Sequence, residues 1–171
     1  MKKILLTGAF KYSKDQLSEI ERLGFKILYV QDERMPLDFD VSDIDIVACN
    51  NLFLYNDIKG FKNLKTIQLT SAGVDRVPLD YINEKGIQLF NARGVYSIPM
   101  AEWVILKILE IYKKSRIFYK NQERHKWEKQ RELFELSDKT AVIIGYGSVG
   151  DEIAKRLKAF GVDVIGVGRR V

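Results

Sequence analysis

Short apolar runs alternate with amphipathic stretches along the first ninety or so residues of the chain. Five of these runs are almost continuously hydrophobic, as the strands of a parallel sheet are when both faces of the sheet are covered. They are residues 3–7, 25–30, 45–49, 64–70 and 86–90. Between the first two, Leu17, Ile20 and Leu23 recur at helical spacing, and Gly24 provides a stop. The pattern predicts an α/β fold with a parallel sheet and helices on both faces, in a first unit of roughly 95 residues.

The pattern changes at Pro99, where a long apolar stretch predicts a single helix with no turn before about Asn121. A basic connector containing Trp127 follows. A second α/β pattern then begins, in which the apolar runs 139–145 and 162–168 flank a helical stretch. Because a doubly wound nucleotide-binding domain needs about six strands, this second unit is only begun.

Composition narrows the class of protein. Hydrophobic residues make up 46% of the 171, enough for a core, but every apolar run is far shorter than the ~20 residues that cross a bilayer. We therefore expect a soluble, cytoplasmic protein without a membrane span, whose first ten residues are a strand and not a signal peptide. Cys49 is the only cysteine, so no intramolecular disulfide can form, and no cluster of metal ligands is apparent.

The formal net charge of +5 is concentrated between Lys113 and Arg131, where basic residues outnumber acidic ones. We favour a solvated helix face over a nucleic-acid-binding patch as the meaning of this segment. Steering of a phosphate-bearing cofactor is a third interpretation. No nucleic-acid partner is therefore expected.

The motif GYGSVG, Gly145 to Gly150, carries the main chemical signal. It lies between a buried-strand pattern and an amphipathic helix, which is the setting of a dinucleotide-binding turn. In such a turn Gly145 permits the tight change of direction, Gly147 lets the backbone approach a pyrophosphate, and Gly150 lets helix and strand pack closely. The helix N-terminus adds N–H groups and a partial positive charge. The alternative is a glycine-rich turn without a ligand.

A second turn, within LTSAGVD, places Ser71, Ala72 and Gly73 at the carboxyl end of a predicted parallel strand. Open α/β sheets bind their ligands at this edge. Small residues there expose consecutive backbone N–H groups, which can hold a carboxylate. Taken alone, the turn is equally compatible with a purely structural role.

Together these segments resemble the D-isomer-specific 2-hydroxyacid dehydrogenases, a family that includes D-lactate and phosphoglycerate dehydrogenases and glyoxylate or hydroxypyruvate reductases. The resemblance is carried by TSAGVDRVPLDYINEKGIQLFNARGVYSIPMAEWVILKILEIYKK, a basic segment with a Trp, and ELSDKTAVIIGYGSVGDEIAKRLKAFGVDVIGVGRR. It begins near Leu64, and the first sixty residues match only in their strand and helix pattern. It implies a flavodoxin-like substrate domain over 1–97, followed over 98–171 by the interdomain helix and the first β-α-β unit of a Rossmann domain.

The resemblance also implies roles for individual residues. Backbone groups at Ala72 and Gly73 would bind the substrate carboxylate, and Ala72 and Met100 would lie on the cofactor side of the cleft. Asn50 and Asn51 fall near further substrate contacts. The other cofactor contacts are expected in the phosphate turn, at Gly145, Tyr146, Gly147, Ser148, Val149 and Gly150.

One departure from the family concerns catalysis. Its members use an Arg that holds the substrate and a Glu–His pair that moves the proton, all from the later part of the Rossmann domain. This chain contains none of the three; Glu102 is expected to fix the interdomain helix, and His125, the only histidine, to be a surface residue.

We therefore interpret the chain as the N-terminal portion of an NAD(P)-dependent oxidoreductase that moves a hydride to or from C2 of a small 2-oxo or 2-hydroxy acid. The portion alone is expected to be inactive, and the full-length protein to be a homodimer. The alternatives are a non-catalytic dinucleotide-binding or regulatory module of the same fold, and a bare folding fragment.

A second departure concerns the cofactor. About 20 residues after its first glycine, an NAD-binding turn has an Asp or Glu for the ribose, but this chain has Gly168, followed by Arg169 and Arg170. Gly168 leaves room for a 2′-phosphate, and the arginines supply positive charge. The sequence favours NADP over NAD. The alternative is that both arginines form a solvated strand end.

Overall fold

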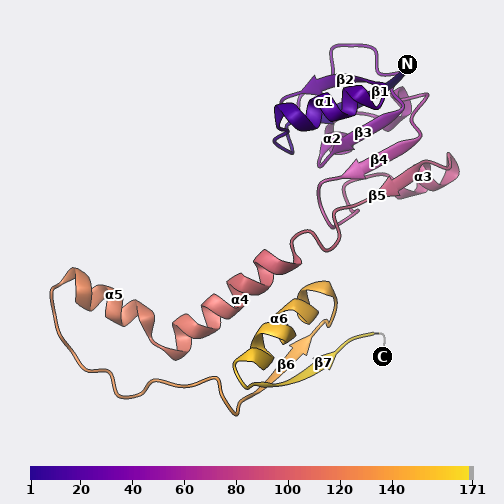
Figure 1. Ribbon diagram of the computed structural model, residues 1–171. Helices are drawn as coiled ribbons and strands as arrows, with labels where there is room; N and C mark the ends of the chain where they lie inside the picture. The colour runs from indigo at the N-terminus through magenta and orange to yellow at the C-terminus, as the bar shows by residue number, and fades with distance from the viewer. Residues whose placement is uncertain (170–171) are drawn as a thin grey trace. The chain divides into compact units, whose positions relative to one another are not determined.

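Five parallel strands form the sheet of the first unit. The computed structural model describes residues 1–169, and the chain divides into two units, Met1–Arg93 and Gly94–Val171. In unit 1 the strand order is β2-β1-β3-β4-β5 with every neighbouring pair parallel, which confirms the predicted flavodoxin-like sheet (Figure 1). The strands are β1 (Lys2–Thr7), β2 (Phe25–Val30), β3 (Ile46–Cys49), β4 (Thr66–Leu69) and β5 (Gln88–Phe90).

Helices connect these strands. The first, α1 (Lys14–Arg22), begins with a capping box in which Ser13 and Gln16 each accept a hydrogen bond from the other's backbone N–H. It packs against β2, and the later helices cover the other face of the sheet. The strand order explains this arrangement, because the chain moves from β1 to β2 in one direction across the sheet and from β3 to β5 in the opposite direction. Right-handed crossovers then place the helices of the two halves on opposite faces. The later helices are α2 (Leu52–Tyr55), the short 3-10 helix η1 (Ile58–Gly60) and α3 (Leu79–Glu84).

The core of unit 1 follows from the register of its strands. Leu5, Val47 and Ile67 pair across β1, β3 and β4, and all three are fully buried. Two residues further along, Cys49 and Leu69 pair and are also fully buried. Because alternate residues of a strand face opposite sides, all five side chains lie on one face, where α2, η1 and α3 enclose them.

Asp45, the residue before β3, is a buried acid that stabilises this unit. Its carboxylate accepts hydrogen bonds from the Lys3 backbone N–H, the Asn63 amide and the Lys65 ammonium, each at 2.9 Å. The Lys3 N–H first, and then Lys65, hold the pKa of Asp45 below its usual value, against the opposing effect of burial. A carboxylate whose pKa is lowered by folding contributes stability above its unfolded-state pKa and loses that contribution as the pH falls through the folded-state pKa.

Replacing Asp45 by asparagine is therefore expected to lower the free energy of unfolding at neutral pH by about 1 to 3 kcal/mol, because a neutral amide accepts weaker hydrogen bonds. The difference from the parent should begin to shrink as the pH falls below about 4, the unfolded-state pKa of an aspartate, and should be lost as the pH falls through the lowered pKa of folded Asp45. Urea denaturation followed by far-UV circular dichroism over a pH series measures both effects. The control is Asp38→Asn, at an exposed acid. A difference that stays constant into strong acid would contradict the role given to Asp45.

The second unit contains one β-α-β unit preceded by two helices. Its strands pair in parallel, with Ala141 opposite Val164. Their inner face packs with two of the helices around Ile105 and Leu157, both buried. The elements are α4 (Ser97–Tyr112), α5 (Ser115–Glu123), β6 (Thr140–Ile144), α6 (Ser148–Ala159) and β7 (Asp163–Val167).

The prediction of a single long helix from Pro99 is wrong, because α4 ends at Tyr112. Lys114 takes a left-handed conformation, with a φ of 49°. The Tyr112 carbonyl, which a continuous helix would pair with the N–H of Arg116, accepts a hydrogen bond from the Phe134 N–H at 3.0 Å instead. The connector thus returns to the end of α4, where the rings of Tyr112 and Phe134 pack edge to face.

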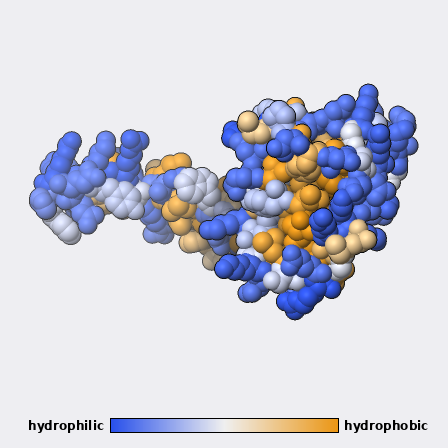
Figure 2. Space-filling view, turned by 90° about the horizontal axis from the view of Figure 1, so that it is seen from above, coloured by the Kyte–Doolittle hydropathy of each residue, from blue (hydrophilic) through white to orange (hydrophobic). Residues whose placement is uncertain are grey.

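Unit 2 leaves apolar side chains at its surface. The outer face of the β6–β7 pair is exposed, and Ile144 on it is 85% exposed. Unit 1 also has exposed apolar side chains: in Figure 2, which looks down on it, hydrophobic residues gather in a patch bordered by hydrophilic ones. Within residues 1–169, none of the helices has the length and hydrophobicity needed to cross a membrane.

Candidate functional site

The phosphate turn, residues 145–150, joins β6 to α6 where the motif predicts it. Gly145 has a φ of 88°, in the left-handed region that favours glycine. Its N–H donates to the Val167 carbonyl at 2.8 Å, and the Tyr146 N–H donates to the same carbonyl at 3.0 Å. The turn is thereby tied to the end of β7 before α6 begins.

The geometry of the turn fits a pyrophosphate. A Cβ added to Gly147 would meet no atom within 4 Å, so the space beside its backbone is open. A Cβ on Gly150 would lie 3.2 Å from Ile143 Cγ2, so helix and strand pack closely there. The first turn of α6 presents N–H groups that have no acceptor four residues earlier, those of Ser148, Val149 and Gly150. Such groups, together with the helix dipole, bind anions.

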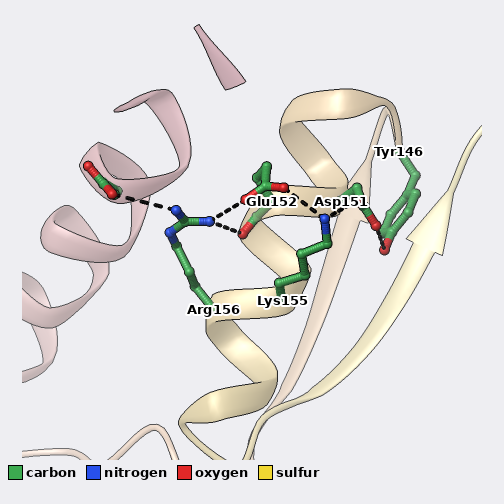
Figure 3. Close-up of polar contacts among 6 residues, drawn as sticks. Tyr146, Asp151, Glu152, Lys155 and Arg156 are labelled. Carbon is green, nitrogen blue, oxygen red and sulfur yellow. Dashed lines mark hydrogen bonds and ion pairs between the residues drawn. The ribbon is translucent and has the colours of Figure 1, made fainter. Parts of the chain in front are cut away.

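Tyr146 and the first acids of α6 form a polar network beside the turn (Figure 3). The Tyr146 hydroxyl lies 3.5 Å from Asp151 Oδ1, and its ring covers Gly166, where a Cβ would come within 2.4 Å of a ring carbon. Lys155 Nζ contacts Asp151 at 2.8 Å and Glu152 at 2.7 Å. Hydrogen bonds to Asp151 and then Glu152 raise the pKa of Lys155. The ammonium thus offsets two carboxylates that would otherwise oppose an anion at this helix end.

Arg156 extends the network from α6 to α4. Its guanidinium contacts Glu152 at 2.6 Å and Glu102 at 3.5 Å (Figure 3). Hydrogen bonds from Lys155 and then Arg156 lower the pKa of Glu152. The contact joins α4 to α6 within unit 2, and the role expected of Glu102 stays a prediction.

The strand end expected to select the cofactor lies next to the phosphate turn. Gly168 and Arg169 directly follow β7, and both are exposed. The turn is hydrogen-bonded to the preceding residue, Val167, so Gly168 is one residue beyond that attachment. Arg170, the second arginine of the prediction, lies outside the described residues.

In unit 1, the turn of Ser71, Ala72 and Gly73 follows β4 as expected. Its carbonyl groups are occupied, because Ser71 Oγ donates to the Gly73 carbonyl at 2.9 Å and Asn91 Nδ2 donates to the Ala72 carbonyl at 2.7 Å. The N–H groups of Ala72 and Gly73 donate to no acceptor within residues 1–169. Both residues are exposed, so these N–H groups can hold a carboxylate.

Asn50 and Asn51 lie at the same edge of the sheet, after β3, and two residues for which the sequence predicts no role organise them. Glu33, 5% exposed, accepts hydrogen bonds from the N–H groups of Asn50 and Asn51 and from the Thr7 hydroxyl. Arg76 Nη1 donates to Asn50 Oδ1 at 2.8 Å. Glu33 and Arg76 both lie in polar loops of the sequence, where hydrophobic periodicity gives no sign of a buried or organising role.

The remaining predicted residues lie in unit 2. Met100, in the first turn of α4, is 52% exposed. His125 follows α5 and is exposed, as predicted for a surface residue. With Phe118 and Trp127 it lines an open surface groove that shares no residue with the phosphate turn. No carboxylate of the described part of the chain pairs with the His125 ring, so it lacks the partner of a proton relay.

Comparisons with known proteins show which family of proteins the chain is similar to. Residues 105–171 match the family model for the D-isomer specific 2-hydroxyacid dehydrogenase, NAD binding domain. The chain is 37% identical over 109 residues to D-3-phosphoglycerate dehydrogenase of Archaeoglobus fulgidus, covering 63% of this chain and 21% of that protein. It is 32% identical over 136 residues to hydroxypyruvate reductase of Thermotoga maritima, covering 79% and 44%. The chain therefore spans less than half the length of these relatives.

A solved structure agrees in fold. The glyoxylate reductase from Paecilomyes thermophila superposes with a TM-score of 0.82, over 99% of this chain and 56% of that chain, at 19% identity. This likeness confirms the predicted α/β class. The match to an NAD-binding domain supports a nicotinamide dinucleotide as cofactor. Together the sequence matches confirm the family recognised from the motifs, and the chain is a relative of the D-isomer specific 2-hydroxyacid dehydrogenases.

Proposed function

We propose that this chain supplies the substrate-binding region and the phosphate turn of an NAD(P)-dependent oxidoreductase acting on D-2-hydroxy acids or 2-oxo acids. The observation that carries the proposal is the phosphate turn, in which Gly147 is open to a ligand and α6 begins directly behind it. The names of the two relatives, a D-3-phosphoglycerate dehydrogenase and a hydroxypyruvate reductase, support the substrate class.

Each turn then has a definite task. The N–H groups of Ala72 and Gly73 hold the substrate carboxylate and so orient C2. Those of Ser148 and Val149 hold the pyrophosphate of the dinucleotide. The cofactor, when bound, supplies or accepts the hydride at C2. The proton transfer needs an acid–base group, for which His125 lacks a partner, so we place that step in a part of the enzyme outside these 171 residues.

We further propose that the cofactor is NADP in preference to NAD. Gly168 leaves space beside the phosphate turn, and Arg169 adds positive charge at the same strand end. A 2′-phosphate is held by such a charge, whereas a ribose hydroxyl is better held by a carboxylate.

A homodimer of the full-length protein is also part of the proposal. Exposed aromatic side chains on α5 and the connector support an interface there, since large apolar groups at a surface are covered in many oligomers. They are Phe118, Tyr119, Trp127 and Phe134.

The variant Gly147→Ala tests the cofactor site. Its Cβ meets no protein atom within 4 Å, and Gly147 has a φ of −122°, so we expect the fold to be unchanged. The added methyl group stands where the pyrophosphate must approach. The pyrophosphate should then lose hydrogen bonds to the turn, and dinucleotide binding should weaken by about tenfold or more. Calorimetric titration with NADPH and NADH measures this and also tests the cofactor preference.

The matched control is Gly60→Ala in unit 1, where the added Cβ would lie 3.4 Å from a Val41 methyl and far along the chain from the turn. Equal affinities of the parent and Gly147→Ala would rule out the site. Tighter binding of NADH than of NADPH would reverse the cofactor preference alone.

A further inference from the structure

An acidic side chain stands at the end of α6 that is proposed to receive the pyrophosphate. Asp151 lies in the first turn of this helix, and its backbone N–H donates to the Gly147 carbonyl at 2.8 Å. Because helical side chains lean toward the N-terminus of their helix, its carboxylate lies on the side of the phosphate turn. A carboxylate stabilises this end of a free helix, but it repels the phosphates of a bound dinucleotide.

Tyr146 gives this acid a role. The Tyr146 hydroxyl donates to Asp151 Oδ1 at 3.5 Å, its only polar contact within residues 1–169 (Figure 3). The Tyr146 ring leaves no space for a Cβ on Gly166. Gly166 pairs with Ile143, which packs against the core of unit 2, so the ring lies on the face of β7 that α6 covers. Asp151 thus holds the ring that fills the space between strand and helix beside the phosphate turn.

Lys155 compensates the charge of Asp151. Its ammonium lies 2.8 Å from Asp151 Oδ2 and 2.7 Å from Glu152 Oε1. Glu152 has a second cationic partner in Arg156, at 2.6 Å. In the described part of the chain, Asp151 pairs with no cation other than Lys155. The two acids and the two bases leave this part of α6 without net charge, and the compensation of Asp151 depends on Lys155.

We propose that Asp151 and Lys155 tune the dinucleotide site as a pair. Asp151 is a positioning residue that acts through Tyr146, and Lys155 cancels its charge so that the acid does not oppose the pyrophosphate. The inference rests on the proposed function, because it needs the dinucleotide phosphates at the phosphate turn. It adds that the two members of one ion pair affect cofactor binding in opposite directions.

Calorimetric titration of the chain with NADPH at low salt tests the pair. Lys155→Gln should weaken binding about threefold, because it leaves the Asp151 charge uncompensated beside the phosphates. Asp151→Asn should tighten binding about threefold, because the charge is gone and an amide oxygen still accepts from the Tyr146 hydroxyl. The double variant should return to within about 1.5-fold of the parent. All these differences should shrink in about 1 M salt, where charges are screened within about 3 Å.

Lys158→Gln is the matched control for the charge. It removes one positive charge from an exposed position of the same helix, farther from the phosphate turn, and Lys158 forms no ion pair in the described residues. Its effect on NADPH affinity should stay below about 1.5-fold. Thermal unfolding followed by circular dichroism checks that each variant is folded.

Asp151→Ala tests the positioning role separately. It removes the same charge as Asp151→Asn but leaves the Tyr146 hydroxyl without an acceptor. We expect it to bind NADPH about threefold less tightly than Asp151→Asn, as the loss of one hydrogen bond allows. When either variant is combined with Tyr146→Phe, this difference should vanish, because the hydroxyl is then absent from both.

The outcomes separate this inference from the proposed cofactor site. Suppose that the parent binds NADPH and Gly147→Ala weakens the binding. If Lys155→Gln and Asp151→Asn then both weaken binding, or both leave it unchanged, the ion pair is merely structural and the inference is overturned. An effect of Lys158→Gln as large as that of Lys155→Gln would also overturn it. If the parent does not bind NADPH, or binds it no better than Gly147→Ala does, the cofactor site itself fails and the inference falls with it.

Discussion

Replacing Glu33 by alanine is expected to destabilise unit 1 by about 3 kcal/mol or more, the largest loss from any single polar side chain of this unit. The change leaves two backbone N–H groups, those of Asn50 and Asn51, and the Thr7 hydroxyl without their acceptor. Each buried donor that loses its partner costs roughly 1 to 3 kcal/mol. Glu33→Gln should lower the stability of unit 1 by less than Glu33→Ala does. Its amide oxygen still accepts hydrogen bonds in place of one carboxylate oxygen, whereas its NH₂ group replaces the other oxygen and cannot accept them.

The reaction rate of Cys49, the only thiol of the chain, measures this loss of stability. Cys49 is fully buried in unit 1, and burial, followed by the nearby charge of Glu33, raises its pKa to about 12. A thiol reagent at mildly alkaline pH therefore reacts only when the unit opens. Both tryptophans, Trp103 and Trp127, lie in unit 2, so their fluorescence does not follow the same event.

We expect Cys49 to be labelled roughly a hundredfold faster in Glu33→Ala than in the parent, which corresponds to about 3 kcal/mol. The control is Glu21→Ala, at an exposed acid of α1, for which the rate should change by no more than about twofold. A labelling rate in Glu33→Ala as slow as the parent's would show that the Asn50 loop does not depend on the carboxylate.

Most of the fold could be predicted because its signals are local. The strand 25–30 has the same limits in the sequence pattern and in the structure, and α1 ends just before Gly24, the predicted stop. The end of α4 could not be predicted in this way. It depends on a hydrogen bond between Tyr112 and Phe134, residues on opposite sides of a connector, and no residue near Tyr112 is a helix breaker.

The residues of the candidate site likewise differ in whether local sequence signals predict them. The phosphate turn was predictable because each glycine meets a local need, such as the positive φ of Gly145. Glu33 and Arg76 were not, because their roles arise only when the sheet register brings Thr7 and Asn50 to one edge. A polar residue in a loop has no periodicity, so its partners become visible only in three dimensions.

The 171-residue chain is expected to show no oxidoreductase turnover with NADPH or NADH and glyoxylate, hydroxypyruvate or pyruvate. General acid–base catalysis contributes about 10² to 10⁴ in rate, and orientation of the substrate contributes further. The only histidine, His125, has no carboxylate partner in the described residues and follows α5, away in sequence from both ligand-binding turns. Oxidation of the nicotinamide cofactor, followed by its absorbance, should stay at the rate of a protein-free blank.

The control for this assay is the full-length protein under the same conditions, with dinucleotide binding of the 171-residue chain measured in parallel. Binding without turnover by the chain, together with turnover by the full-length protein, is the result that the proposed function predicts, because the phosphate turn lies within these residues and the proposal places the acid–base group outside them. Binding without turnover by both would favour the non-catalytic dinucleotide-binding module. Turnover by the chain alone would place a proton donor among residues 1–171, and the proposal that the acid–base group lies outside them would then have to be abandoned.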